Sequence, residues 1–168
     1  DDLEDDEYDD LEDEIDPTVK LLKQNAILML SGAIGPHHLG LCHELLSYHY
    51  NPDFNDTITL LINSPGGVCE IGWAIVDVMN FVKHPIQTVC VGFAGSMAAD
   101  IFVNGDTRVI GANSTLMIHD AAFENGGSYG DLVAHRRYQD IEFARGIIHY
   151  RKNSIYKSEE EVKKQLPK

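Results

Sequence analysis

The sequence predicts an α/β fold with a parallel sheet, and two observations support this prediction. Short apolar runs typical of buried strands alternate with segments whose apolar residues recur at helical spacing. Strands that alternate with helices favour parallel pairing, because each helix provides a crossover connection. With 168 residues, the chain also has the length of one domain and can bury a sizeable core.

The first half of the chain predicts two strands and two helices. Each strand is a short run of apolar or β-branched residues, and a turn follows it. Each helix ends at or just before a residue pair that contains proline. In chain order, these elements are strand 26–30, helix 37–50, strand 57–63 and helix 70–82.

The second half predicts three strands and two helices. A buried strand is followed by a run of small residues that leads into a short helix, and two short strands then precede a long helix. In chain order, these elements are strand 86–93, a helix that ends at residue 103, strands 108–110 and 115–119, and a helix from 131 to about 156.

The negative charge of the chain is concentrated at one end. The net charge is −14, and residues 1–16 contain twelve Asp and Glu but no Lys or Arg. The remaining residues contain fifteen acids and thirteen bases, which gives a net charge of −2. Segment 1–16 has too few apolar residues to fold alone, so we predict a disordered acidic arm followed by a folded domain over 17–168. The alternative is an arm that gates a pore or binds a partner.

Nothing in the sequence favours a membrane, nucleic-acid-binding or secreted protein. The chain has no apolar run of the roughly 18 residues that a membrane helix needs, no visible signal peptide and no basic stretch. Its three cysteines, Cys42, Cys69 and Cys90, cannot all pair and form no C-x-x-C motif. We therefore predict a cytoplasmic protein with reduced, largely buried cysteines, and with neither a nucleic-acid nor a membrane partner.

Ser96 is a candidate nucleophile. It follows a predicted buried strand and opens a predicted helix among small residues, which allow the sharp turn that exposes a hydroxyl and let a substrate approach the backbone. The amide of Met97 would lie at the start of that helix, where it can stabilise an oxyanion. The G-x-S-x-G motif is incomplete because Ala94 replaces its first glycine, so a buried structural serine is the alternative.

The segment Ser64-Pro65-Gly66-Gly67 is a second candidate element of a site. Consecutive glycines after a strand expose backbone N–H groups, which suits an oxyanion donor or the binding of an extended substrate. The alternative interpretation is a simple β-turn.

His119 ends a predicted strand next to a loop, where an imidazole can reach a pocket and act as a general base. The alternative is a histidine with a structural role. His37, His38 and His43 are close in sequence, but His38 and His43 are five residues apart, off the helical i, i+4 spacing, and no acid is arranged around them. We therefore predict no metal site.

Three segments together resemble ClpP, the proteolytic subunit of the ATP-dependent Clp protease. They are residues 62–67 (Ile-Asn-Ser-Pro-Gly-Gly), 95–98 (Gly-Ser-Met-Ala) and 117–119 (Met-Ile-His), and their order and separations fit the family. The resemblance covers roughly residues 16–168. It implies a ClpP/crotonase-like spiral of strand–strand–helix units, in which the helix from 131 to about 156 is a protruding handle.

The resemblance also implies a function. Ser96 would attack the peptide carbonyl, His119 would accept the proton, and the backbone amides of Gly67 and Met97 would hold the oxyanion. The chain after Gly67 would form a strand that binds the substrate by β-augmentation. The expected protein is a serine endopeptidase for unfolded proteins or peptides, without a cofactor, whose copies form two stacked heptameric rings, a tetradecamer with the sites inside.

The resemblance implies a third triad member as well, an Asp roughly fifty residues after the histidine. When residues 158–160 are matched to the end of the family's handle, this Asp falls just past Lys168. Neither Asp106 nor Asp120 stands at the family's position. Two alternatives stay open, namely that the Asp follows Lys168 or that the triad is incomplete.

The sequence departs from the family pattern at other positions. Asp100, one helical turn after Ser96, replaces an apolar or small residue, and its carboxylate would either raise the pKa of His119 or point outward. Thr59 and Leu61 replace aromatic residues of the pocket that binds a Clp-type ATPase chaperone, although Phe81 matches another aromatic of that pocket. The acidic arm also replaces the hairpin that lines the axial pore in the family. These departures argue against coupling to an ATPase.

Three functions are compatible with these features. The first is an ATP-independent peptidase subunit of a ring-shaped assembly. The second is a non-catalytic or weakly active ring subunit that modulates a related ClpP subunit, and the absent Asp and altered pocket favour it. The third, a crotonase-type acyl-CoA enzyme, makes no use of a Ser–His pair, and no thioester-specific residue stands out.

Overall fold

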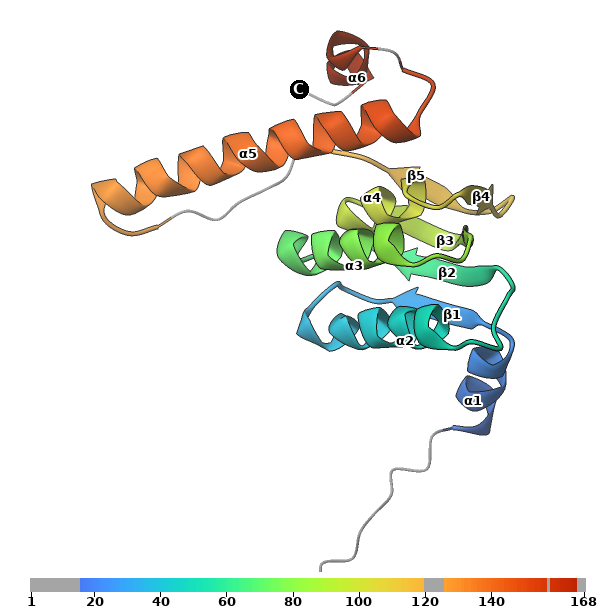
Figure 1. The fold of residues 1–168 in the computed structure, drawn as a ribbon. Coiled ribbons are helices and arrows are strands. Elements are labelled where there is room, and N and C mark those ends of the chain that lie inside the picture. Colours follow the sequence, from blue (N-terminus) through green and yellow to red (C-terminus); the bar gives the residue numbers. More distant parts are fainter. Residues whose placement is uncertain (1–15, 120–125, 157, 166–168) are drawn as a thin grey trace, which may run out of the picture.

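A parallel β-sheet organises the fold, and its strands follow the predicted apolar runs (Figure 1). The structure is a computed structural model that describes residues 16–119, 126–156 and 158–165. Strands β1 to β4 are neighbours in that order, β5 also pairs with β3, and every pair is parallel. The predicted α/β class with a parallel sheet is therefore confirmed. The strands are β1 (Ile27–Ser31), β2 (Ile58–Ser64), β3 (Ile86–Gly95), β4 (Thr107–Ile110) and β5 (Thr115–Met117).

The helices connect these strands and extend the chain beyond the sheet. Four of them match predicted helices to within a few residues, while α1 and α6 were not predicted. The helices are α1 (Pro17–Gln24), α2 (Leu39–Tyr50), α3 (Cys69–Phe81), α4 (Met97–Val103), α5 (Tyr129–Asn153) and α6 (Glu159–Gln165), with a 3-10 turn over Pro36–His38 before α2.

Helix α1 begins directly after the segment that was predicted to be an acidic arm. The Asp16 side chain accepts a hydrogen bond from the Thr18 amide at 2.7 Å, so Asp16 is the N-cap of α1, and Pro17 occupies the first turn. An aspartate at this position satisfies an amide that has no partner within the helix, which is why it is favoured there. Asp16, which the sequence assigned to the arm, thus caps the first helix. Residues 1–15 of the predicted arm lie outside the described residues.

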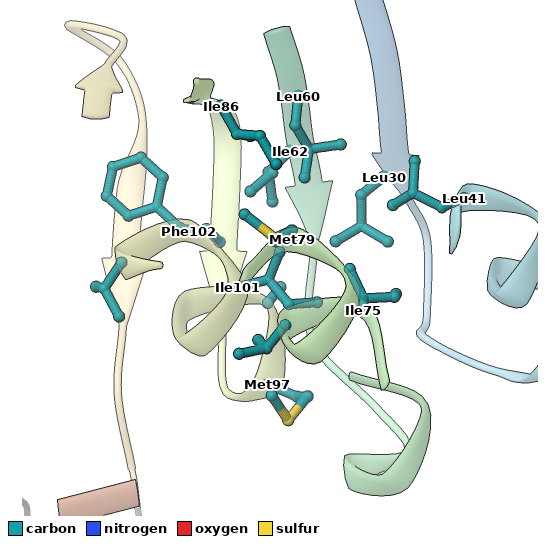
Figure 2. Close-up of a cluster of buried hydrophobic side chains, with 14 of the residues drawn as sticks. Leu30, Leu41, Leu60, Ile62, Ile75, Met79, Ile86, Met97, Ile101 and Phe102 are labelled. Carbon is teal, nitrogen blue, oxygen red and sulfur yellow. The ribbon is translucent and has the colours of Figure 1, made fainter. Parts of the chain in front are cut away.

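The core lies between the sheet and the helices that cover one of its faces (Figure 2). Alternate residues of β2 are fully buried, as the two-residue period of a strand requires, while Thr59 and Leu61 are half-buried on the opposite face. Helices α3 and α4 contribute Ile75 and Ile101, both fully buried. This packing fixes the ends of β3 and β5 relative to α4, where the candidate site residues lie.

Helix α5 extends well past the edge of the sheet, as the handle prediction requires (Figure 1). A capping box begins it, because the Ser128 hydroxyl accepts from the Asp131 amide and the Asp131 carboxylate accepts from the Ser128 amide at 2.8 Å. Near its C-terminal end, Ile147 and Tyr150 are buried in the core. No helix among the described residues has the length and apolar character needed to cross a membrane.

Candidate active site

Strands β3 and β5 bring Ser96 and His119 to the same edge of the sheet. Gly95 is aligned with Met117, and the Ser96 amide donates a hydrogen bond to the Met117 carbonyl oxygen at 2.8 Å. Ser96 directly follows β3, and His119 lies two residues after the end of β5. Both residues line one cavity, so the two candidates selected from the sequence share a site.

Ser96 has a strained backbone conformation that suits an exposed nucleophile. Its φ is 52° and its ψ is −129°, in a region that residues with a side chain rarely occupy. It is the N-cap of α4, and its carbonyl oxygen accepts from the amides of Ala99 at 2.8 Å and Asp100 at 3.3 Å. A sharp strand-to-helix turn of this kind is the geometry by which hydrolases present a serine hydroxyl.

The turn at Gly66 and Gly67 lies directly against Ser96. A Cβ atom on Gly66 would be 2.7 Å from the Ser96 Cβ and 3.0 Å from the Met97 amide nitrogen. Gly66 has φ +93° and Gly67 has φ +152°, values that favour glycine. The two glycines therefore allow both the turn and its close approach to the nucleophile, as expected of an oxyanion-forming segment.

The predicted substrate-binding strand after Gly67 is wrong. Residue 67 makes only an isolated bridge with Ile34, whose amide donates to the Gly66 carbonyl at 2.8 Å and whose carbonyl accepts from the Val68 amide at 3.0 Å. Helix α3 then begins at Cys69. The apolar residues from Ile71 onward recur at helical spacing and pack on the core, and this pattern prevents an extended strand here.

Met97 is held in place by α3. Its side chain is buried, and a Cβ atom on Gly72 would lie 2.1 Å from its Cγ, so Met97 fills the space that this glycine leaves. Fixing the first residue of α4 also fixes the Met97 amide beside the Gly66–Gly67 turn. The two backbone segments that the sequence predicted for the oxyanion hole are therefore adjacent.

A buried carboxylate on α5 also lines the cavity. Glu142 accepts hydrogen bonds from Trp73 Nε1 and from Arg145 Nη1, each at 2.6 Å. The Arg145 guanidinium lies 5.4 Å from the centre of the Trp73 ring. Sequence reasoning missed this group, since Glu142 and Trp73 are 69 residues apart and Glu142 with Arg145 looks like an ordinary pair on a helix surface.

Asp100 lines the same cavity and does not point outward. Its Oδ1 is shielded from solvent and has no hydrogen-bond partner among the described residues. Burial raises the pKa of Asp100 to about 7, a hydrogen bond with Tyr150 lowers it and the charge of Glu142 raises it. The carbonyl oxygen of Asp100 is 2.8 Å from His149 Nε2, which ties α4 to α5. Of the two orientations left open by the sequence, the structure has the one that faces the site.

The remaining sequence candidates lie elsewhere or have other roles. His38 makes local contacts, because its Nδ1 accepts from the Gly35 amide at 3.2 Å and its Nε2 is 3.0 Å from the Ser31 carbonyl oxygen. In the described part of the chain, no group of three or more His, Cys, Asp or Glu could hold a metal ion. The Asp106 carboxylate accepts from the Ile86 amide at 2.8 Å, at the end of β3 remote from Ser96. Asp120 is outside the described residues.

The three cysteines are free, as predicted, and Cys42 and Cys90 are buried. Cys69 is half-buried and lines the cavity. Burial raises the pKa of its thiol, and Glu142 raises it further, so Cys69 is protonated near neutral pH. A protonated thiol is a poor nucleophile, so the electrostatics of the cavity do not activate Cys69.

Comparison with known protein families gives a match over nearly the whole chain. The family model of the Clp protease matches residues 10–168. This chain belongs to the Clp protease family. The matched range contains Ser96, His119, the Gly66–Gly67 turn and α5, and membership confirms the resemblance and implies a ClpP-type peptidase in general.

Within the Clp protease family, the departures noted in the sequence now have structural positions. Thr59 and Leu61 lie on the face of β2 that points away from the helices α2 to α4, and both are half-buried. Phe81, at the end of α3, is 57% exposed, and its ring centre lies 4.8 Å from that of His49. One aromatic residue thus remains at the surface, on a helix, while the two substituted positions lie on the sheet.

Proposed function

We propose that this chain is a serine endopeptidase subunit that hydrolyses peptide bonds of unfolded proteins or peptides inside a ring-shaped assembly. One observation supports this most strongly, namely that Ser96 and His119 line one cavity at the ends of adjacent parallel strands. Membership of the Clp protease family supports peptidase activity in general. The proposal assigns this activity to these residues.

In the proposed mechanism, the Ser96 hydroxyl attacks the peptide carbonyl and its proton passes to the His119 imidazole. The carbonyl oxygen becomes an oxyanion, which the backbone amides of Gly67 and Met97 stabilise. The imidazolium then donates its proton to the leaving amine, and the C–N bond breaks to give an acyl-enzyme. Water, deprotonated by the same imidazole, hydrolyses the ester and regenerates Ser96.

We further propose a homo-oligomer of two stacked heptameric rings in the cytoplasm. Apolar side chains exposed along α5 support such an assembly, because an exposed apolar surface of this kind is typical of an interface. They are Leu132, Val133, Ile141, Phe143 and Ile148. Native mass spectrometry of the purified protein tests this proposal, since a mass of fourteen subunits is expected and a stable monomer contradicts it. A Clp-type ATPase or a related ClpP subunit is a candidate further partner.

A fluorophosphonate probe tests the assignment of the nucleophile. The full-length assembled protein is incubated with the probe, and the labelled residue is identified by peptide mass spectrometry. Labelling of Ser96 is expected, with loss of labelling in Ser96→Ala and in His119→Ala. The Ser47→Ala variant is the matched control, because Ser47 lies on α2 and does not line the cavity. Absence of label on Ser96 in the assembled protein contradicts the proposal.

A second candidate function is a non-catalytic ring subunit that modulates a related protease. Its support is the altered surface at Thr59 and Leu61 together with the acidic side chain of Asp100 in the cavity. This alternative expects normal rings without peptide hydrolysis, and mixed rings when the chain is co-expressed with an active relative. Native mass spectrometry of the co-expressed pair distinguishes the two functions, since pure rings alone contradict the alternative.

A further inference from the structure

We propose that Asp100 determines specificity by selecting substrates with a Lys or Arg side chain on the residue whose carbonyl Ser96 attacks. This inference rests on the proposed peptidase function and names the substrate class of that site. It depends on the position of Asp100 in the cavity, on the missing partner of its Oδ1 and on the charges around it.

The cavity is where the side chain of that substrate residue must lie. During attack, the substrate carbonyl carbon is bonded to Ser96 Oγ, and the substrate side chain is attached only one carbon further along. Ser96, His119 and Asp100 line the same cavity. Asp100 lies one helical turn after Ser96, since its amide donates to the Ser96 carbonyl at 3.3 Å. A side chain that enters this cavity from the reacting carbon therefore extends toward Asp100.

The two carboxyl groups of the cavity differ in their hydrogen bonds. Both oxygens of Glu142 are satisfied, one by Trp73 Nε1 and the other by Arg145 Nη1. In Asp100, by contrast, Oδ1 has no partner within the described residues and is shielded from solvent. A buried acceptor without a donor costs free energy, so a ligand that supplies a donor gains affinity from it.

The charges that face Asp100 favour a donor with a positive charge. Glu142 is paired with Arg145, and its negative charge still raises the pKa of Asp100. Burial lowers the pKa of His149 and raises that of Tyr150, so both are neutral near pH 7. Within the described residues no ion pair includes Asp100, and His119, the other titratable base of the lining, is the proposed proton acceptor from Ser96. A substrate Lys or Arg therefore provides the cation for an ionised Asp100 in a charge-assisted hydrogen bond.

The rest of the lining suits the aliphatic part of such a side chain. Trp73, Met97, Phe143 and Ile147 present apolar surface in the cavity, against which the methylene groups of Lys or Arg pack while the charged end reaches a carboxylate. Burial raises the pKa of Asp100 to about 7, so at neutral pH a cationic substrate shifts the carboxyl to its ionised form and its proton leaves to solvent.

Matched peptides test this inference. Four fluorogenic substrates differ only at the residue whose carbonyl is attacked, which is Arg, citrulline, Lys or Leu. Citrulline has the shape of Arg without its charge. The assembled full-length protein is expected to hydrolyse the Arg peptide at least about 10-fold more efficiently, in kcat/KM, than the citrulline peptide. In Asp100→Asn the ratio is expected to fall to about one, whereas in Asp77→Asn, which alters an exposed carboxyl on α3, it stays at the original value.

The pH dependence of the Arg-to-citrulline ratio in the unmodified protein gives a test that needs no variant. The ratio is expected to rise as pH passes upward through about 7, because Asp100 becomes ionised there. A ratio near one at all pH values, or an equal loss for all four peptides in Asp100→Asn, overturns the inference. If the inference fails in this way but the fluorophosphonate still labels Ser96, the proposed function stays intact. Absence of both labelling and hydrolysis would contradict the proposed function itself.

Discussion

A Cβ atom on Gly66 would lie 2.7 Å from the Cβ of Ser96 and 2.6 Å from the carbonyl oxygen of Gly95. The turn after β2 and the nucleophile after β3 are therefore in contact only because residue 66 has no side chain. Ser64 and Ala94 are partners in the preceding sheet register, so the two parallel strands deliver both segments to the same place. Geometry at Gly66 is thus expected to affect activity strongly, although Gly66 takes no part in the chemistry itself.

Replacing Gly66 with alanine tests this relationship. The new methyl group would force apart the turn and Ser96 and would occupy a left-handed backbone conformation, so we expect a loss of about 1–3 kcal/mol in the free energy of unfolding. Displacement of the oxyanion segment should reduce kcat by about 100-fold or more. Urea denaturation and hydrolysis of a fluorogenic peptide measure the two effects.

Gly40→Ala is the control for this prediction. No heavy atom lies within 4 Å of a Cβ on Gly40, which is inside α2, so alanine there should stabilise the protein by about 0.5–1 kcal/mol and leave kcat unchanged. Full activity of Gly66→Ala would show that the turn does not contribute to catalysis.

The buried Glu142 predicts unequal effects for two arginines of α5. Arg145 pairs with Glu142, whose side chain is 3% exposed, whereas Arg136 pairs with Asp140, whose side chain is 63% exposed. Arg145→Gln leaves a buried carboxylate without its cation and is expected to destabilise the protein by about 2–4 kcal/mol. Arg136→Gln should change the free energy of unfolding by at most about 0.5 kcal/mol.

Denaturation of both arginine variants in parallel measures this difference. Glu142→Gln combined with Arg145→Gln should recover most of the stability lost in Arg145→Gln, because no uncompensated charge then remains. Equal stability losses in the two single variants would contradict the assignment of Glu142 as a buried charge.

The raised pKa of Asp100 predicts how stability varies with pH. Burial holds the folded pKa at about 7, above the ordinary value of 3.8, so the folded protein retains a proton that the unfolded chain releases in this range. The free energy of unfolding should therefore fall as pH rises from about 4 to about 7 through this group. The Asp100→Asn variant lacks this titrating group. Above pH 7 its free energy of unfolding should exceed that of the original protein by a difference on the order of 2–4 kcal/mol, and near pH 4 the two values should be similar.

The difference between the two proteins at each pH is the quantity to measure. Burial lowers the pKa of His149, so protonation of that side chain destabilises the fold in acid, but its contribution is present in both proteins and cancels. Urea denaturation between pH 4 and pH 8 gives the difference. A constant offset across this range would show that Asp100 does not titrate within it.

The sequence predicted the sheet well because its strands are short apolar runs that need no partner to be recognised. Helix α1 was missed, since its N-cap, Asp16, belongs to an acidic run and the helix buries no residue completely. Helix α6 has only seven residues, with Val162 as its one buried side chain, and gives too short a pattern to detect. Local patterns therefore predicted the core elements but not the peripheral ones.

The site was predictable to the extent that its groups belong to local motifs. Ser96, His119 and the glycine pair each end or follow a strand, and parallel pairing brings those strand ends together. The surroundings of Asp100 and Glu142 depend on how α5 packs against α3 and α4, through contacts such as that between Trp73 and Glu142 across 69 residues. No pattern within a single segment contains that information.

The strained backbone at Ser96 predicts that this residue lowers the free energy of unfolding. Ser96 has φ 52° and ψ −129°, which glycine adopts far more readily than a residue with a Cβ atom. Ser96→Ala removes the hydroxyl but keeps the strain, so its free energy of unfolding should stay close to that of the original protein. Ser96→Gly removes both the hydroxyl and the backbone strain. We expect it to be more stable than Ser96→Ala by about 1 kcal/mol, while both variants lose hydrolysis and probe labelling.

Thermal and urea denaturation of the two variants measure this difference in stability. Because neither variant has a hydroxyl, the difference reports the backbone conformation alone. A lower stability of Ser96→Gly would mean that the backbone freedom glycine gains in the unfolded chain outweighs the relief of strain, and that the turn is not a store of strain.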